Sequence, residues 1–106
     1  MKISFDTFNK LLTTHLRDNC CQEILFNLEN SEKYNHCWMG AINKNGNVEY
    51  WFGLTQDGKE AYDYPSFDDM ASALVFHGKS IKEIWEHIDI LSINGCSPES
   101  IIPFYL

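Results

Sequence analysis

The sequence predicts one α+β domain, residues 1–106, with an antiparallel sheet of three or four strands. An N-terminal helix and two or three C-terminal helices flank this sheet. Two observations carry the prediction. Asn45-Gly46 separates two runs rich in aromatic and β-favouring residues, and apolar residues recur at helical spacing near the N-terminus and again in residues 80–88. A chain of this length buries roughly two-thirds of its unfolded surface without disulfides or metal.

The strongest local pattern is a β-hairpin over residues 35–55. Asn and Gly both adopt the positive φ angles of a type I′ turn, so Asn45-Gly46 fixes the turn and the register follows by counting outward. This register places each tryptophan of the hairpin opposite a glycine whose bare backbone the indole covers, in the pairs Trp38/Gly53 and Trp51/Gly40. The tryptophan face is too apolar to stay bare, and we expect a helix of the same chain to cover it, the alternative being a partner.

Capping residues and periodicity place the elements around this hairpin. Ser4 is the predicted N-cap of a helix over residues 4–18, in which apolar residues recur every three or four positions. Alternating apolar residues predict a strand over residues 22–29 that pairs with the hairpin. Residues 60–64 predict a short fourth strand at the edge of the sheet.

The C-terminal part is predicted to be mainly helical. Ser66 begins a second helix, whose apolar stripe is Phe67, Met70, Ala71 and Leu74. A third helix over residues 80–88 shows the clearest amphipathic spacing in the chain. Residues 89–93 fit either a strand or an extended loop, and Ser97-Pro98 begins a last turn of helix. We expect the apolar tail that follows to pack on the domain or on a second copy.

The formal net charge of −7 lies almost entirely in the C-terminal half. Residues 60–106 hold eight acidic and two basic residues, a net charge of −6. This charge argues against direct binding to nucleic acid or an anionic membrane and favours a partner protein with a basic surface, unless the acids serve only solubility. The chain shows neither an apolar run long enough to span a membrane nor an N-terminal secretory pattern, so we expect a cytoplasmic protein.

The four cysteines and four histidines predict no metal site and no cofactor. They lack the Cys-x₂-Cys or His-x₃-His spacing with which two side chains chelate one zinc ion. We expect the free thiols of a reduced cytosol, three of them partly buried. Cys96, which follows Asn94-Gly95 and precedes Ser97-Pro98, is the most plausible reactive thiol.

No catalytic signature accompanies these features, so the favoured function is a non-enzymatic protein-interaction role. A small acidic inhibitor, immunity protein or anti-defence protein of this kind would occlude a basic site on its partner. Aromatic residues beside acidic ones are typical of such a surface. The predicted partner-binding residues are Trp51, Tyr62, Asp63, Tyr64, Asp68, Asp69, Glu83 and Glu86.

Two alternative functions stay open. A small-ligand-binding or Cys-dependent enzyme domain would have a pocket lined by Trp38, Trp51 and Cys96, with at least one converging polar group. A homo-oligomeric structural protein would use the tryptophan face or the apolar residues 101–106 as its interface. The chain is accordingly expected to be a monomer or a homodimer.

Overall fold

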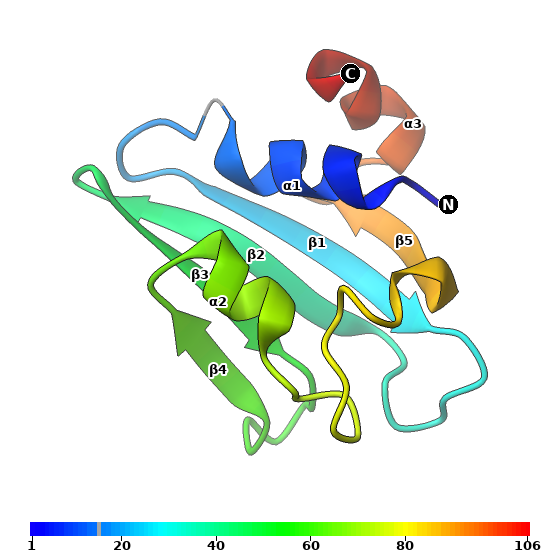
Figure 1. Ribbon diagram of the computed structural model, residues 1–106. Coiled ribbons are helices and arrows are strands. Elements are labelled where there is room, and N and C mark those ends of the chain that lie inside the picture. Colours follow the sequence, from blue (N-terminus) through cyan, green and yellow to red (C-terminus); the bar gives the residue numbers. More distant parts are fainter. Residues whose placement is uncertain (15) are drawn as a thin grey trace.

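The computed structural model describes residues 1–14 and 16–106 and contains an antiparallel sheet with helices on one of its faces (Figure 1). The strands lie in the order β4-β3-β2-β1-β5. They are β1 (Cys21–Leu28), β2 (Cys37–Lys44), β3 (Asn47–Gly53), β4 (Ala61–Tyr64) and β5 (Ile88–Ile93). The helices among the described residues are α1 (Phe5–Thr13), α2 (Phe67–Ser72), α3 (Pro98–Ile101) and the 3₁₀ turns η1 (Trp85–His87) and η2 (Ile102–Tyr105). The predicted α+β class is confirmed, and the sheet has five strands where three or four were expected.

The hairpin of β2 and β3 forms with the predicted register. The turn residues Asn45-Gly46 have φ angles of 54° and 89°, in the left-handed region that a type I′ turn requires. Trp38 lies opposite Gly53, and Trp51 lies opposite Gly40. Only Trp51 covers its glycine, because its Cζ2 would lie 2.9 Å from a Cβ at Gly40. At Gly53 only the Cβ of Trp38 comes within 4 Å of a built Cβ, at 3.9 Å, so the Trp38 indole does not cover its glycine.

Both edges of the sheet are short or partly occupied. β4, the predicted edge strand, has four residues and is followed by Pro65, which cannot donate a ladder hydrogen bond. Residues 89–93, left undecided by the sequence, belong to β5 and pair with β1. The outer edge of β5 is partly occupied, because the Ile90 N–H donates to the Met1 carbonyl at 2.9 Å.

The predicted helix over residues 80–88 is wrong. Its capping box forms: Ser80 Oγ accepts from the Glu83 N–H at 3.2 Å, and Glu83 Oε1 accepts from the Ser80 N–H at 3.1 Å. The helix does not continue, because Ile88 already begins β5 and pairs with Leu28. The apolar spacing nevertheless identifies the buried residues correctly, which are Ile81, Ile84 and Ile88.

Two predicted helices are shorter than expected. α1 ends at Thr13 and Thr14 is extended, whereas residue 15 of the predicted helix over 4–18 lies outside the described residues. α2 begins after the N-cap Ser66, as predicted, but ends at Ser72. Leu74, which the sequence placed on the apolar stripe, therefore leaves the helix face and is 64% exposed.

The C-terminal segment packs on the domain only in part. α3 begins with Pro98 at its first position, as predicted, and Ile102 after it is buried. Phe104 and Leu106 extend into solvent. None of the helices among the described residues is long and apolar enough to cross a membrane.

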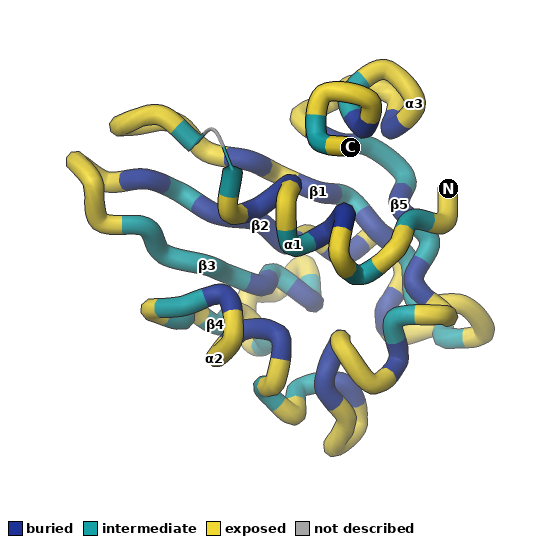
Figure 2. Tube along the Cα trace, turned by 45° about the horizontal axis from the view of Figure 1, so that its top comes forward, coloured by how far each residue is buried: buried dark blue, intermediate teal, exposed yellow. Residues whose placement is uncertain are grey.

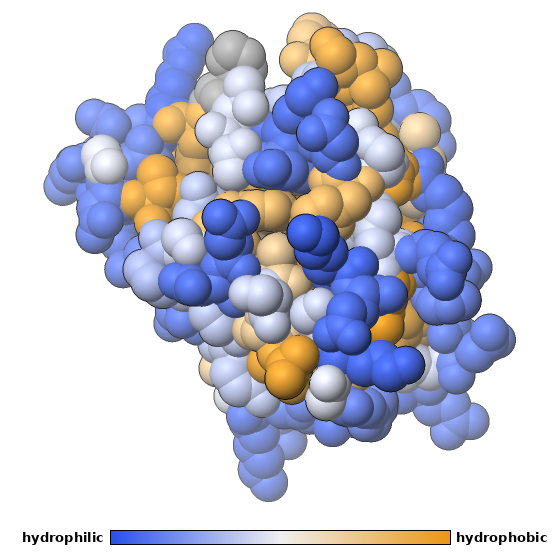
Figure 3. Space-filling view, viewed as in Figure 1, coloured by the Kyte–Doolittle hydropathy of each residue, from blue (hydrophilic) through white to orange (hydrophobic). Residues whose placement is uncertain are grey.

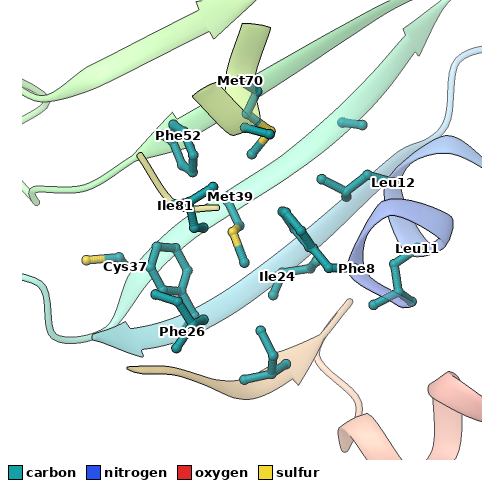
Figure 4. Packing of buried hydrophobic residues seen from close by; sticks show 14 of the residues in the cluster. Phe8, Leu11, Leu12, Ile24, Phe26, Cys37, Met39, Phe52, Met70 and Ile81 are labelled. Carbon is teal, nitrogen blue, oxygen red and sulfur yellow. The ribbon is translucent and has the colours of Figure 1, made fainter. Parts of the chain in front are cut away.

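The hydrophobic core lies between one face of the sheet and a layer made of α1, α2 and residues 73–87 (Figures 1 and 2). Both layers contribute fully buried side chains (Figure 4), among them Phe8, Leu12, Ile24, Phe26, Met39, Phe52, Met70 and Ile81. Aromatic rings join the two layers where Phe52 of β3 meets Phe76 edge-on at 5.4 Å. Within the helix layer, Phe8 of α1 stacks on Trp85 with centroids 4.4 Å apart. The core is thus built on a single face of the sheet.

The close approach at Gly40 predicts a steric limit on β2. Gly40→Ala should lower the free energy of unfolding by about 2–3 kcal/mol, because its Cβ would overlap the Gln22 carbonyl oxygen and press on the Trp51 ring. Gly53→Ala is the matched control, since the nearest atoms lie 3.9 Å from its Cβ, and we expect a change within about 0.5 kcal/mol. Urea unfolding followed by tryptophan fluorescence measures both variants. Equal stability of the two variants would contradict this packing.

Candidate functional site

The sheet face opposite the helices is not covered by any helix or strand of residues 1–14 and 16–106 (Figures 1 and 2). The expectation that a helix covers the tryptophans is therefore wrong. The helix layer packs on the alternate positions of the strands, such as Met39 and Phe52, and this leaves the positions between them outside the core. We call the outward-facing apolar residues the open face; they are Leu25, Trp38, Ile42 and Trp51. Figure 3 shows the opposite, helix-covered side.

Three carboxylates lie on the same side of the sheet, each directly across a ladder from a glycine or an apolar residue. The cross-strand pairs are Glu23/Gly40, Glu49/Ile42 and Asp63/Trp51. Glu49 binds Lys44 Nζ at 3.1 Å, but both side chains are more than one-third exposed, so the ion pair is weak. Glu23 and Asp63 form no ion pair with the described residues. The apolar open face thus has an acidic border.

A cleft of about 520 Å³ opens at one end of this face, where β2 begins and β3 ends. Trp38 forms part of its wall and belongs to the open face as well. The other lining residues come from β1 and from the loops before β2 and after β3, and are Leu25, Lys33, Asn35, His36, Gly53, Leu54, Thr55 and Gln56. His36 has a φ of 55°, and its N–H donates to Asn27 Oδ1 at 2.6 Å, which holds this loop against β1.

A polar network behind the cleft fixes the position of Lys33. Its ammonium binds Glu60 Oε2 at 2.7 Å, and the Tyr34 hydroxyl donates to Glu60 Oε1 and to the Val75 carbonyl, both at 3.2 Å. The hydrogen bond from Lys33 lowers the pKa of Glu60. Burial, followed by the hydrogen bond to Glu60, raises the pKa of the Tyr34 phenol. Neither group is therefore a base or an acid tuned to neutral pH.

The nearest thiol is equally unreactive. Cys37 is buried beside this network, and its Sγ donates to the Leu54 carbonyl at 3.3 Å. Burial raises the pKa of this thiol to about 11, so it stays protonated at neutral pH and lacks the charge of a nucleophile. The three groups behind the cleft, Glu60, Tyr34 and Cys37, therefore all have pKa values shifted away from neutrality.

The predicted partner-binding residues divide between the two sides of the molecule. Trp51 and Asp63 form a cross-strand pair on the side of the open face. Tyr62 and Tyr64 lie on the helix side, where Tyr64 meets Phe52 edge-on at 6.1 Å. The remaining four also lie outside the open face: Asp68 and Asp69 in the first turn of α2, Glu83 in the capping box and Glu86 in η1.

The pocket of the alternative prediction is not assembled as expected. Trp38 lines the cleft, but Trp51 and Cys96 do not. The expectation of three partly buried cysteines is also wrong, because only Cys37 is buried and the other three are exposed. Within the described residues, no three His, Cys, Asp or Glu side chains lie close enough together to hold a metal ion.

The polar residues of the cleft have no signature in the sequence. Lys33, Asn35 and His36 belong to a segment that reads as a turn and a strand start, and Thr55 and Gln56 read as a second turn. The folded sheet brings these two loops together. Only Trp38 carried a usable signal, namely its register opposite a glycine.

Comparison with known proteins found no family model, no curated protein and no solved structure that matches this chain.

The Lys33–Glu60–Tyr34 network predicts a pH-dependent contribution to stability. Glu60→Gln should lower the free energy of unfolding at pH 7 by about 1 kcal/mol. Because the folded-state pKa of Glu60 is lowered, its contribution is fully present above the unfolded-state pKa of about 4.3 and is lost as pH falls through the folded-state pKa. Urea unfolding at pH 7 and at about pH 3 measures this, with exposed Glu32→Gln as the control. An effect of Glu60→Gln that is equal at both pH values would refute the network.

Proposed function

We propose that this chain is a non-enzymatic protein-interaction domain that binds a partner through the open face. The observation that carries the proposal is an apolar sheet face with two tryptophans that the helices leave uncovered and three carboxylates border. A contiguous apolar patch with a polar rim is the usual composition of a protein interface. Occlusion of a basic site on the partner, in the manner of a small acidic inhibitor or immunity protein, is the mode of action we propose.

Trp38 supplies the main energetic argument. Its side chain is 39% exposed, the largest exposure of any tryptophan in the chain. A tryptophan has about 250 Å² of surface, so a partner would remove on the order of 100 Å² of Trp38 from water, worth ~2.5 kcal/mol. A side chain of that value is a binding hot spot. Trp51 contributes less, because its ring already packs on Gly40.

Charge favours a basic partner over a second copy of the chain. The border of the open face carries three carboxylates and Lys44, the adjoining cleft adds Lys33, which is paired with Glu60, and the whole chain has a formal charge of −7. Two copies would therefore repel each other, whereas lysine or arginine on another protein would be attracted. Such attraction between exposed charges weakens as salt screens it. Of the partner-binding residues that the sequence predicts, the proposed interface includes Trp51 and Asp63 and excludes those on the helix side.

The cleft supports a second candidate function, the binding of a small ligand beside Trp38. Its volume of about 520 Å³ lies within the range of small-molecule sites, about 300–1,000 Å³. The two functions make different demands on the surface. A small ligand needs only the cleft, whereas a protein partner also contacts Ile42, Trp51 and the acidic border.

Affinity capture from the source cells tests the first function. The wild-type chain and Leu74→Ala, a control at an exposed position on the helix side, should retain the same protein. Trp38→Ala should weaken retention by about tenfold or more, because the hot spot is lost. Asp63→Asn should weaken it less and reduce its dependence on salt between about 0.05 and 0.5 M. Retention that is unaffected by both Trp38→Ala and salt would count decisively against the proposal, provided that each variant keeps the wild-type unfolding midpoint.

A further inference from the structure

We propose that the cleft beside Trp38 is an anchoring pocket for an uncharged aromatic side chain of the partner. In this arrangement Asn35 and Gln56 hydrogen-bond the peptide groups on either side of that aromatic residue. This inference rests on the proposed protein-interaction function and names the chemistry that the partner must present. It follows from three properties of the cleft: its walls, its charge and its free amides.

The walls of the cleft suit a flat apolar group. The Trp38 indole stands at one side, Leu25 supplies aliphatic surface, and Gly53 has no side chain to fill the space between them. A ring inserted here would lie against the indole, an arrangement that stabilises aromatic pairs by about 0.5–1.5 kcal/mol beyond the area they bury. The volume of about 520 Å³ exceeds that of a single ring, so part of the flanking backbone enters with it.

The charge of the cleft selects a neutral occupant. The lining residues include one ammonium group, that of Lys33, and no carboxylate among the residues that the structure describes. A lysine or arginine of the partner would meet Lys33 with no counter-charge in the lining. A carboxylate of the partner would have to compete for Lys33 with Glu60, which binds it at 2.7 Å and also accepts from the Tyr34 hydroxyl. A cation of the partner therefore finds no carboxylate in the lining, and a carboxylate of the partner binds Lys33 only by displacing Glu60.

The polar groups of the cleft match a peptide backbone. Asn35 and Gln56 are exposed, and each amide offers both donors and an acceptor, as the peptide group does. The nearby Thr55 hydroxyl is already engaged, because it donates to Asp57 Oδ1 at 2.7 Å and accepts from the Glu60 N–H at 3.2 Å. The two amides are therefore the groups through which the cleft distinguishes a residue within a peptide from a free ring.

An NMR titration of the full chain with N-acetyl-tyrosinamide tests the proposal, since this neutral probe carries a ring and two flanking amides. We expect a saturable shift of the Trp38 indole N–H resonance. N-acetyl-alaninamide, which lacks the ring, and p-cresol, which lacks the amides, should each bind at least about tenfold more weakly. Equal binding of N-acetyl-alaninamide would overturn the aromatic anchor. Equal binding of p-cresol would overturn peptide recognition and support a small-ligand site.

Variants at Gly53 provide the matched control. Gly53→Leu should fill the cleft and weaken probe binding by about tenfold or more, whereas Gly53→Ala should stay within about threefold of wild type, because its Cβ meets only atoms 3.9 Å away. Undiminished binding to a folded Gly53→Leu would place the probe elsewhere and refute the pocket. If Gly53→Leu does not fold, Trp38→Ala serves as the test instead. It removes one wall of the cleft without inserting a larger side chain, and it should also weaken probe binding.

The probe titration and the partner capture can refute the anchoring pocket and the proposed function separately. If no probe binds but capture of a partner still depends on Trp38 and salt, the anchor is wrong and the proposed function stands. If the probe binds but no protein is captured through Trp38, the assignment to a partner side chain is overturned. A probe that instead releases self-associated chains would identify the occupant as a second copy, with Phe104, which is 78% exposed, as its available ring.

Discussion

The Asn45-Gly46 turn sets the register of the central hairpin, and both faces of the molecule depend on that register. With the turn in place, Met39 and Phe52 point into the core, while Trp38 and Trp51 point out of it. A shift of one residue would exchange the two sets and place indoles in a core built for smaller side chains. The contact of Trp51 with Gly40 reinforces this choice, because no other residue at position 40 leaves room for the ring.

The two faces are unequal because α1, α2 and residues 73–87 all pack on the same side of the sheet (Figure 1). α1 and α2 supply buried aromatic and aliphatic residues, and residues 73–87 add Phe76, Ile81 and Ile84 without forming a long helix. The apolar side chains of these segments are buried against one face of the sheet. The opposite face carries tryptophans, carboxylates and glycines. This composition is too polar for a hydrophobic core and more apolar than an ordinary solvated surface.

Local signals in the sequence predicted the elements that local chemistry determines. The hairpin register, the N-caps Ser4 and Ser66 and the edge strand β4 all follow from residues close together in the chain. The structure of residues 80–88 was not predicted correctly, because the same apolar spacing fits a helix and also a series of turns that buries every third or fourth residue. The pairing of β5 with β1, which joins residues 60 to 69 positions apart, decided between them.

The candidate site was less predictable than the fold for the same reason. The sequence indicated an apolar tryptophan face but not whether a helix would lie on it, since that depends on the direction in which each connection crosses the sheet. It placed acidic and aromatic residues in one surface that the sheet divides between two sides, as Asp63 and its neighbours Tyr62 and Tyr64 show. The cleft forms only when two separate loops meet at the end of the hairpin.

Photo-crosslinking in the source cells tests the central claim, that the open face is a binding surface, most directly. A benzophenone side chain in place of Ile42 lies on the open face, and the same group in place of Leu74 lies on the helix side. The account predicts a covalent adduct with one other protein from position 42 and none from position 74. Adducts from position 74 alone, or only dimers of the chain from position 42, would contradict it.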